Sequence, residues 1–240
     1  MTILFDLDGT LVDTAPDFIH ALNVVRAEIN MLPLKPSNQT SIRMVEVAVT
    51  EGLAGLVAAG LKVKAEHPES PLLQKRLLHA YQKNLGLYST LFPGIEALLK
   101  TLEQRHIPWG VVTNKPAQQT HPLMDRLGLS HRAACIVSGD TTPYAKPHPE
   151  PLFYACRQIG VSPIECLYIG DAERDIIAGN AAGMTTIAAL FGYIEDITLA
   201  KNWGAHHYIH HADEILPWFE TWERLKNPHE IKSSFEQGIV

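Results

Sequence analysis

Short, uninterrupted runs of apolar residues recur along the chain, and each ends at a polar or glycine-containing segment. Five of them are residues 2–7, 107–113, 134–138, 166–170 and 185–190. Apolar runs of this length bounded by turn residues are typical of strands that are buried on both faces. The pair Tyr208-Ile209 predicts one further short strand near the end of the chain.

Between these runs, the apolar positions follow a helical pattern. Such segments occupy residues 95–104, 118–127, 149–158 and 175–182. Gly128 and Gly183 follow two of them directly and Gly160 follows a third after one residue, as expected where helices end. Strands that alternate with helices at this spacing predict right-handed crossovers and a parallel sheet with helices on both faces.

The stretch from Pro16 to Tyr88 contains few strand signals and is helical in pattern throughout. Pro33 and Pro36, and later Pro68 and Pro71, divide it into three or four helices. The pattern therefore predicts an α/β core with a helical cap inserted after the first strand. We expect the core at residues 1–14 and 89–226, the cap at residues 15–88, and a polar C-terminal tail at residues 227–240.

Composition and charge narrow the classes of function. Of the 240 residues, 46% are hydrophobic and 19% charged, and the formal net charge is −6. The sequence has no basic run of the kind that binds nucleic acid, so nucleic acid is not an expected partner. It also has no apolar run long enough to cross a membrane. The sparse, odd count of three cysteines favours reduced thiols in the cytoplasm. Pairs of histidines at 206–207 and 210–211 are better explained as surface residues than as a metal site, since no Cys or Glu cluster supports them.

The first segment with chemical potential is Asp6-Leu7-Asp8-Gly9-Thr10, at the end of the first predicted strand. One carboxylate can attack phosphorus as a nucleophile, and the other can donate and later accept a proton. Two such groups close together repel each other, so a hard cation and an anionic phosphate are expected to share the site. Gly9 permits a tight turn and Thr10 can donate a hydrogen bond. The alternative is an ordinary polar turn.

Two further segments offer groups that bind phosphate. Thr113 and Asn114 end an apolar strand, where a hydroxyl and an amide can hold phosphate oxygens, although such residues are also common in turns. Lys146 lies in a proline-rich segment before a predicted helix. There it can balance the charge of carboxylates and phosphate, or it can be an ordinary surface lysine.

A second acidic pair follows the strand at residues 166–170. Asp171 stands directly at the strand end and can ligate a cation. Asp175 comes four residues later, near the start of a helix, where the helix dipole stabilises a carboxylate. For Asp175 a role as a helix-terminal residue is an equal alternative. Every segment named so far follows a predicted strand, and ligands of open parallel sheets bind outside the carboxyl ends of the strands.

In this order, the four motifs resemble those of the haloacid dehalogenase-like hydrolase superfamily, in its phosphoglycolate phosphatase-like branch. The resemblance covers roughly residues 1–225 and implies a Rossmann-like parallel sheet core with an inserted helical cap. It implies a magnesium-dependent phosphatase that acts on a small phosphorylated metabolite through a phospho-aspartate. The oligomeric state is left open between a monomer and a homodimer.

The resemblance also implies a role for each matching residue. Asp6 would be the nucleophile and Asp8 the general acid and base. Thr113 and Asn114 would bind the phosphate, and Lys146 would balance charge. The magnesium ligands would be Asp6, the backbone carbonyl of Asp8 and Asp171, with Asp175 in support.

Within this branch, several stretches are similar to the bacterial N-acetylmuramic acid 6-phosphate phosphatases. They are residues 13–18, 109–116, 192–194 and 202–205. N-acetylmuramic acid 6-phosphate and 2-phosphoglycolate both carry a carboxylate besides the phosphate. Arg43, in the predicted cap, is the candidate for binding that carboxylate, with a solvated helix charge as the alternative. Tyr193 and Trp203 could supply aromatic surface for a sugar, or could belong to the core.

Three rival functions share the fold. A dehalogenase would not need the second acid, Asp8. A sugar phosphomutase would keep both acids and differ mainly in the cap. A non-catalytic binding module predicts loss of Asp6, Asp8, Lys146 or Asp171, and all four are present.

Overall fold

The computed structural model describes residues 1–35 and 37–226. Its centre is a six-stranded sheet in the order β5-β4-β1-β6-β7-β8, in which every neighbouring pair is parallel. The strands are β1 (Thr2–Phe5), β4 (Trp109–Val112), β5 (Cys135–Val137), β6 (Cys166–Gly170), β7 (Thr185–Ala189) and β8 (His207–Ile209). The predicted α/β fold with a Rossmann-like parallel sheet is therefore confirmed.

Alternate residues of each strand face opposite sides of the sheet, and both sides are buried. Leu4, Val112 and Tyr168 belong to the core that α7 (Glu150–Ile159) and α8 (Glu173–Ala181) cover. Ile3, Phe5 and Val111 belong to the larger core on the opposite face. That face is covered by α5 (Ile95–Gln104), α6 (Ala117–Arg126) and α10 (Ile215–Lys226). Burial on both faces explains why the strands are apolar without alternation.

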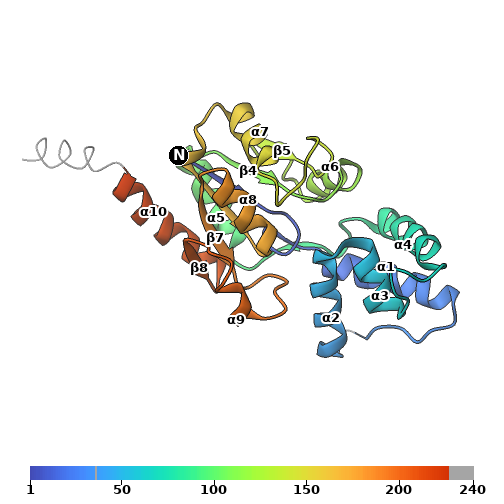
Figure 1. Cartoon of the computed structure of the whole chain (residues 1–240). Helices are drawn as coiled ribbons and strands as arrows, with labels where there is room; N and C mark the ends of the chain where they lie inside the picture. Colours follow the sequence, from blue (N-terminus) through green and yellow to red (C-terminus); the bar gives the residue numbers. More distant parts are fainter. Residues whose placement is uncertain (36, 227–240) are drawn as a thin grey trace, which may run out of the picture.

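Four helices form a separate lobe, which we call the cap (Figure 1). They are α1 (Ala15–Glu28), α2 (Gln39–Thr50), α3 (Gly52–Leu61) and α4 (Ser70–Asn84). They pack mainly on one another, and the rings of Phe18 on α1 and Tyr81 on α4 stack at 4.0 Å between centroids. Pro16 and Pro71 lie in the first turns of α1 and α4, where no backbone N–H is needed. The expected cap boundaries, residues 15 and 88, remain a prediction.

The chain enters and leaves the cap through a small antiparallel pair, β2 (Val12–Asp13) and β3 (Thr90–Leu91). Asp17, which is buried, accepts hydrogen bonds from the backbone N–H groups of Gly86 and Tyr88 at 2.6 and 2.7 Å. Tyr193 donates its hydroxyl to Asp13 at 2.6 Å. These bonds hold the two crossings together and fix where the cap stands over the sheet.

Several short elements have no counterpart in the sequence pattern. They are β2, β3, the one-turn helix α9 (Ile197–Ala200) and the 3-10 turns η1 (Pro163–Glu165) and η2 (Ala212–Glu214). The longer helix α10 was not predicted either. The predicted tail at residues 227–240 lies outside the described residues. In the part of the chain that the structure describes, no helix is long and apolar enough to span a membrane.

Candidate active site

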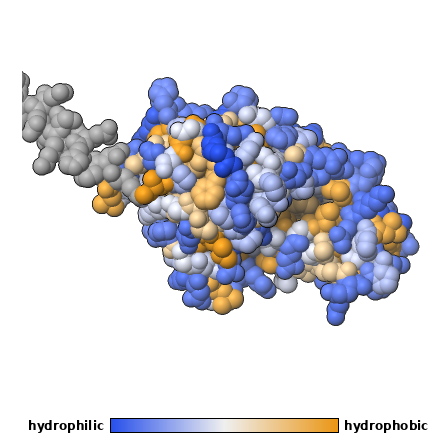
Figure 2. Space-filling model, turned by 45° about the horizontal axis from the view of Figure 1, so that its top comes forward, coloured by the Kyte–Doolittle hydropathy of each residue, from blue (hydrophilic) through white to orange (hydrophobic). Residues whose placement is uncertain are grey.

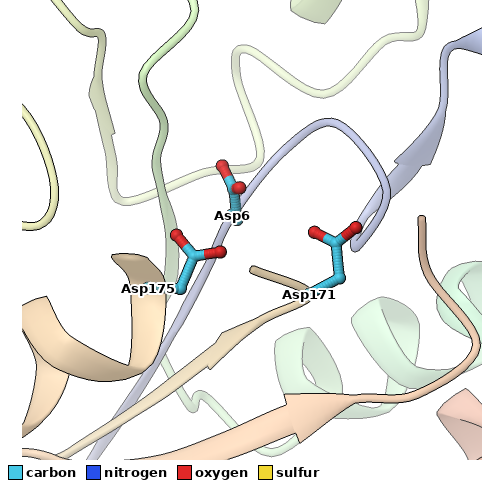
Figure 3. A group of neighbouring side chains, drawn as sticks. All are labelled: Asp6, Asp171 and Asp175. Atoms are coloured by element: carbon cyan, nitrogen blue, oxygen red, sulfur yellow. The ribbon is translucent and has the colours of Figure 1, made fainter. Parts of the chain in front are cut away.

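The carboxyl ends of three adjacent strands bring the predicted site residues together. Asp6 follows β1, Thr113 follows β4 on one side, and Asp171 follows β6 on the other. Asp175 reaches the same place from the first turn of α8. Ligand atoms of Asp6, Asp171 and Asp175 all lie within 4.8 Å of one another, and Figure 3 shows the three carboxylates gathered at these strand ends.

The loop after β1 turns tightly because of Gly9. Its φ is +83°, a conformation that favours glycine. A Cβ at this position would lie 2.1 Å from Asp171 Oδ2. The loop can therefore approach Asp171 this closely only because Gly9 has no side chain. Thr10 then donates its hydroxyl to Asp171 Oδ1 at 2.9 Å. The first and last motifs of the sequence are thus joined directly.

Lys146 is the buried cation of this cluster, with a side chain that is closed to solvent. Its Nζ lies 2.9 Å from Asp6 Oδ1 and 2.7 Å from Asp175 Oδ1. It also donates to the Val112 carbonyl and to the Tyr168 hydroxyl, at 2.9 and 2.8 Å. The alternative of an ordinary surface lysine does not apply.

Negative charge exceeds positive charge among these buried groups. Burial, and then the carboxylates of Asp6 and Asp175, raise the pKa of Asp171 to about 7. Burial and Asp6 also raise the pKa of Asp175, against the opposing effect of Lys146. Three carboxylates with one lysine leave an excess that a cation would neutralise.

The donor set fits a hard divalent cation such as Mg²⁺, because it offers only oxygen ligands. The three carboxylates differ in the hydrogen bonds and ion pairs that their oxygens already make. Asp175 Oδ1 contacts Lys146, and its Oδ2 accepts the Ala172 N–H at 3.0 Å. Asp6 binds Lys146 and the Leu7 N–H through Oδ1 alone. Asp171 accepts from Thr10 at Oδ1 and from the Tyr193 N–H at Oδ2, at 2.9 and 2.8 Å, and it is the one carboxylate of the three without a contact to Lys146. Each carboxylate oxygen has two lone pairs, so all three side chains can still offer a ligand atom.

Asp8, the second acid of the first motif, lies apart from the three clustered carboxylates. Its Oδ1 accepts hydrogen bonds from Thr14 Oγ1 at 2.7 Å and from Lys115 Nζ at 2.9 Å. Lys115 is buried beneath the cap and lies over the rings of Phe18 and Tyr81, at 5.1 and 4.9 Å from their centroids. Burial alone would lower the pKa of Lys115, but the Asp8 carboxylate and the Tyr81 hydroxyl together outweigh it, and the pKa is raised.

A cavity of about 510 Å³ lies between the strand ends and the cap, and Asp6, Asp8 and Thr113 line its floor. Its cap side is mostly apolar, formed by Val49, Leu53, Leu56, Leu78 and Tyr81. Figure 2 shows the hollow between the two lobes with hydrophobic residues along it. Such a cavity suits a molecule with a charged end and a less polar body.

Asn114 lines the cavity, so its contact with the phosphate stays a prediction, whereas Arg43 does not line it. The side-chain amide of Asn114 makes two hydrogen bonds with the backbone of Lys146. It donates to the Lys146 carbonyl at 2.8 Å and accepts from the Lys146 N–H at 3.0 Å. Its amide thus positions the lysine. Arg43 does not line the cavity at all, contrary to expectation. It is exposed on α2, pairs with Glu46 at 2.9 Å, and donates to the carbonyls of Gly192 and Ile194.

The two aromatic candidates also lie elsewhere. Tyr193 is buried at the cap crossings, and Trp203 packs on the small apolar cluster around Ile176. In their place, the structure brings Lys115 and Arg174 to the cavity wall. Lys115 directly follows Thr113-Asn114, and Arg174 directly precedes Asp175. Their positions next to these motif residues were the sequence signal that could have identified them as cavity residues.

Comparison with known proteins gives a consistent picture. A family model described as haloacid dehalogenase-like hydrolase matches residues 3–189. A Pseudomonas aeruginosa protein named N-acetylmuramic acid 6-phosphate phosphatase is 39% identical over 214 residues, covering 89% of this chain and 92% of that protein. A Xanthomonas campestris protein named phosphoglycolate phosphatase is 40% identical over 199 residues, covering 80% of this chain and 83% of that protein. The crystal structure of a predicted phosphoglycolate phosphatase from Haemophilus somnus matches with a TM-score of 0.76 at 26% identity, over 91% of this chain and 97% of that one.

Proposed function

The chain belongs to the haloacid dehalogenase-like hydrolases, and we propose that it is a magnesium-dependent phosphatase that cleaves a small phosphate monoester through a phospho-aspartate on Asp6. The coarser class, a phosphoric monoester hydrolase of this family, is the activity for which its relatives are named. One observation carries the finer proposal. Asp6 is held by Lys146 beside Asp171, at the floor of a cavity that Asp8 also lines.

In the first step, Asp6 Oδ2 attacks phosphorus. Oδ1 is the oxygen that accepts from Lys146 and the Leu7 N–H, so these contacts orient the side chain and direct Oδ2 to the substrate. The bond between phosphorus and the ester oxygen breaks, and Asp8 reacts in its protonated form, donating a proton from Oδ2 to the departing oxygen, since Oδ1 already accepts from Thr14 and Lys115. The products of this step are an alcohol and a phospho-aspartate.

In the second step, water replaces Asp6 on phosphorus. The Asp8 carboxylate takes a proton from the water as it attacks, and the bond between phosphorus and Asp6 breaks. Inorganic phosphate leaves, and both aspartates return to their starting states. Thr113 lines the cavity beside Asp6 and is proposed to donate its hydroxyl to a phosphate oxygen.

Asp6 and Asp171 are the proposed side-chain ligands of Mg²⁺, with the Asp8 backbone carbonyl as a third. Bound Mg²⁺ would neutralise part of the negative charge of the carboxylates and the phosphate. Asp175 supports the site by holding Lys146, and Lys146 balances charge on Asp6 whether or not metal is bound.

For the substrate, we favour N-acetylmuramic acid 6-phosphate over 2-phosphoglycolate. The cavity of about 510 Å³ is far larger than a two-carbon acid requires, and its apolar cap wall suits the face of a sugar ring. The relative named for the sugar phosphate also aligns with more of this chain, 89% against 80%.

Phosphate release from purified protein tests this proposal. We expect Mg²⁺-dependent release from both compounds, with a larger kcat/KM for the sugar phosphate, and no turnover by Asp6→Asn. A larger value for 2-phosphoglycolate would reverse the choice of substrate. Turnover that requires an added sugar bisphosphate, with transfer in place of release, would identify a phosphomutase.

A further inference from the structure

The cavity wall carries two cations, Lys115 and Arg174, and only Lys115 makes a direct ion pair. Lys115 is paired with Asp8 at 2.9 Å and enclosed by two aromatic rings. Arg174, at the start of α8, has no ion pair with any carboxylate in residues 1–35 and 37–226. Burial lowers the pKa of Arg174, but the carboxylates of Asp175, Asp6 and Asp171 raise it from beyond ion-pair distance. A half-buried arginine that faces a cavity and makes no direct ion pair is a candidate for binding an anion from outside the protein.

The hydrogen bonds of Arg174 lead to the same conclusion. Its Nη1 donates to the carbonyl of Thr50, at the last turn of α2, at 2.9 Å. Its Nε is buried and has no partner among the described residues. A buried N–H without a partner costs on the order of 1–3 kcal/mol. The remaining donors of the guanidinium form a planar fork that matches the two oxygens of a carboxylate.

The hydrogen bond to Thr50 places the guanidinium of Arg174 on the cap side of the cavity. The phosphate would lie over Asp6 and Thr113 at the strand ends. Arg174 instead bridges α8 to the cap at Thr50, next to the cap residues Val49 and Gly52 that line the cavity. Arg174 therefore lines the same cavity as the proposed phosphate site, within its cap-side wall.

We propose that Arg174 binds a carboxylate of the substrate and thereby selects phosphate esters that carry one. This inference rests on the proposed phosphatase function and adds the residue that sets specificity. It assigns to Arg174 the contact expected of Arg43, whose guanidinium is engaged outside the cavity by Glu46 and two backbone carbonyls. A phosphate contact, or a purely structural bridge to Thr50, are the competing roles.

Matched substrates separate these roles. N-acetylmuramic acid 6-phosphate and N-acetylglucosamine 6-phosphate differ only by the lactyl group that bears the carboxylate. In the second pair, 2-phosphoglycolate carries a carboxylate where ethyl phosphate carries a methyl group. For each pair, we define the acid preference as kcat/KM for the carboxylated compound divided by kcat/KM for the other. Arg174→Gln should lower this preference about 10- to 100-fold, the effect expected from losing hydrogen bonds to a charged group.

Three further variants complete the experiment. Arg174→Lys keeps the charge but loses the fork, and should lower the acid preference by a smaller factor. It also serves if Arg174→Gln does not fold. Arg43→Gln tests the rival residue, and Arg105→Gln is a matched control, because Arg105 is exposed in an ion pair with Glu220 away from the cavity lining. Both should keep the acid preference of the wild type.

The outcomes are distinct for the inference and for the proposed function. If the wild type hydrolyses both members of each pair equally, or if both Arg174 variants lose the same factor on both members, the inference is wrong while the phosphatase stands. A fall in acid preference for Arg43→Gln alone would also overturn it. If the wild type releases phosphate from none of the four compounds, the proposed function fails and the inference falls with it.

Discussion

Lys146→Met tests whether the buried lysine holds the acidic cluster together. Methionine has a similar length but no charge, so the variant removes the partner of Asp6 and Asp175 and leaves the packing nearly the same. Lys146 Nζ makes contacts of 2.9 and 2.7 Å with these two carboxylates, and all three side chains are buried. Removing one member of a buried ion pair costs about 3–5 kcal/mol of unfolding free energy. For a chain of this size, that corresponds to a fall in Tm of about 6–20 °C.

The assay is thermal and urea unfolding in excess chelator, so that no metal compensates for the lost charge. Lys100→Met is the matched control, because Lys100 pairs with Glu96 on the surface and its side chain is 64% exposed. This exposed pair should contribute about 0–1 kcal/mol. The double variant Lys146→Met/Asp175→Asn removes both charges of one pair, and should be more stable than the sum of the two single losses predicts.

Two results would refute this reasoning. One is a loss for Lys146→Met no larger than that for Lys100→Met. The other is strict additivity in the double variant, which would mean that Lys146 and Asp175 do not interact.

Three other predictions concern the chemistry. Asp8→Asn should lower kcat/KM, which reports the steps through release of the leaving group, more for alkyl phosphates than for aryl phosphates, whose leaving groups need less protonation; equal losses of kcat/KM would give Asp8 another role. Lys115→Met should lower kcat/KM about 10- to 100-fold, again more on alkyl phosphates, because Lys115 holds Asp8 at 2.9 Å; an unchanged kcat/KM would contradict this. Asp171 has a pKa raised to about 7 by burial and then by Asp6 and Asp175, so protons occupy this ligand below that pH. The rise in Tm on adding Mg²⁺ should therefore be larger at about pH 8 than at about pH 6, and an equal rise at both would speak against Asp171 as a ligand.

The sequence predicted those parts of the fold that depend on local patterns. The five longer apolar runs became strands because both of their faces are buried, and β6 begins and ends as expected. The pair of β2 and β3 was not foreseen, since a two-residue strand pairs only where the cap crossings bring its partner near. The prolines predicted three or four helices in the cap, and the structure has four; the break between α2 and α3 falls at Gly52, whose φ is +70°.

The site could be predicted as far as strand ends determine it. Asp6, Thr113 and Asp171 meet because the carboxyl ends of β1, β4 and β6 are adjacent. Arg43 and Arg174 could not be distinguished in advance, since each stands on a helix. The helical face that lines the cavity depends on how the cap is placed over the sheet. Hydrogen bonds between residues far apart in the sequence determine that placement.

The most direct test of the account is to trap the phosphoryl group on Asp6. Asp8→Asn should still react with an aryl phosphate, and then lack the base that activates water for the second step. After an acid quench, mass spectrometry of peptic peptides should show one added phosphoryl group on the peptide that contains Asp6. The label should be absent from Asp6→Asn/Asp8→Asn. Phosphoryl transfer to a different residue, or turnover by Asp6→Asn at the wild-type rate, would contradict the central claim that Asp6 is the nucleophile.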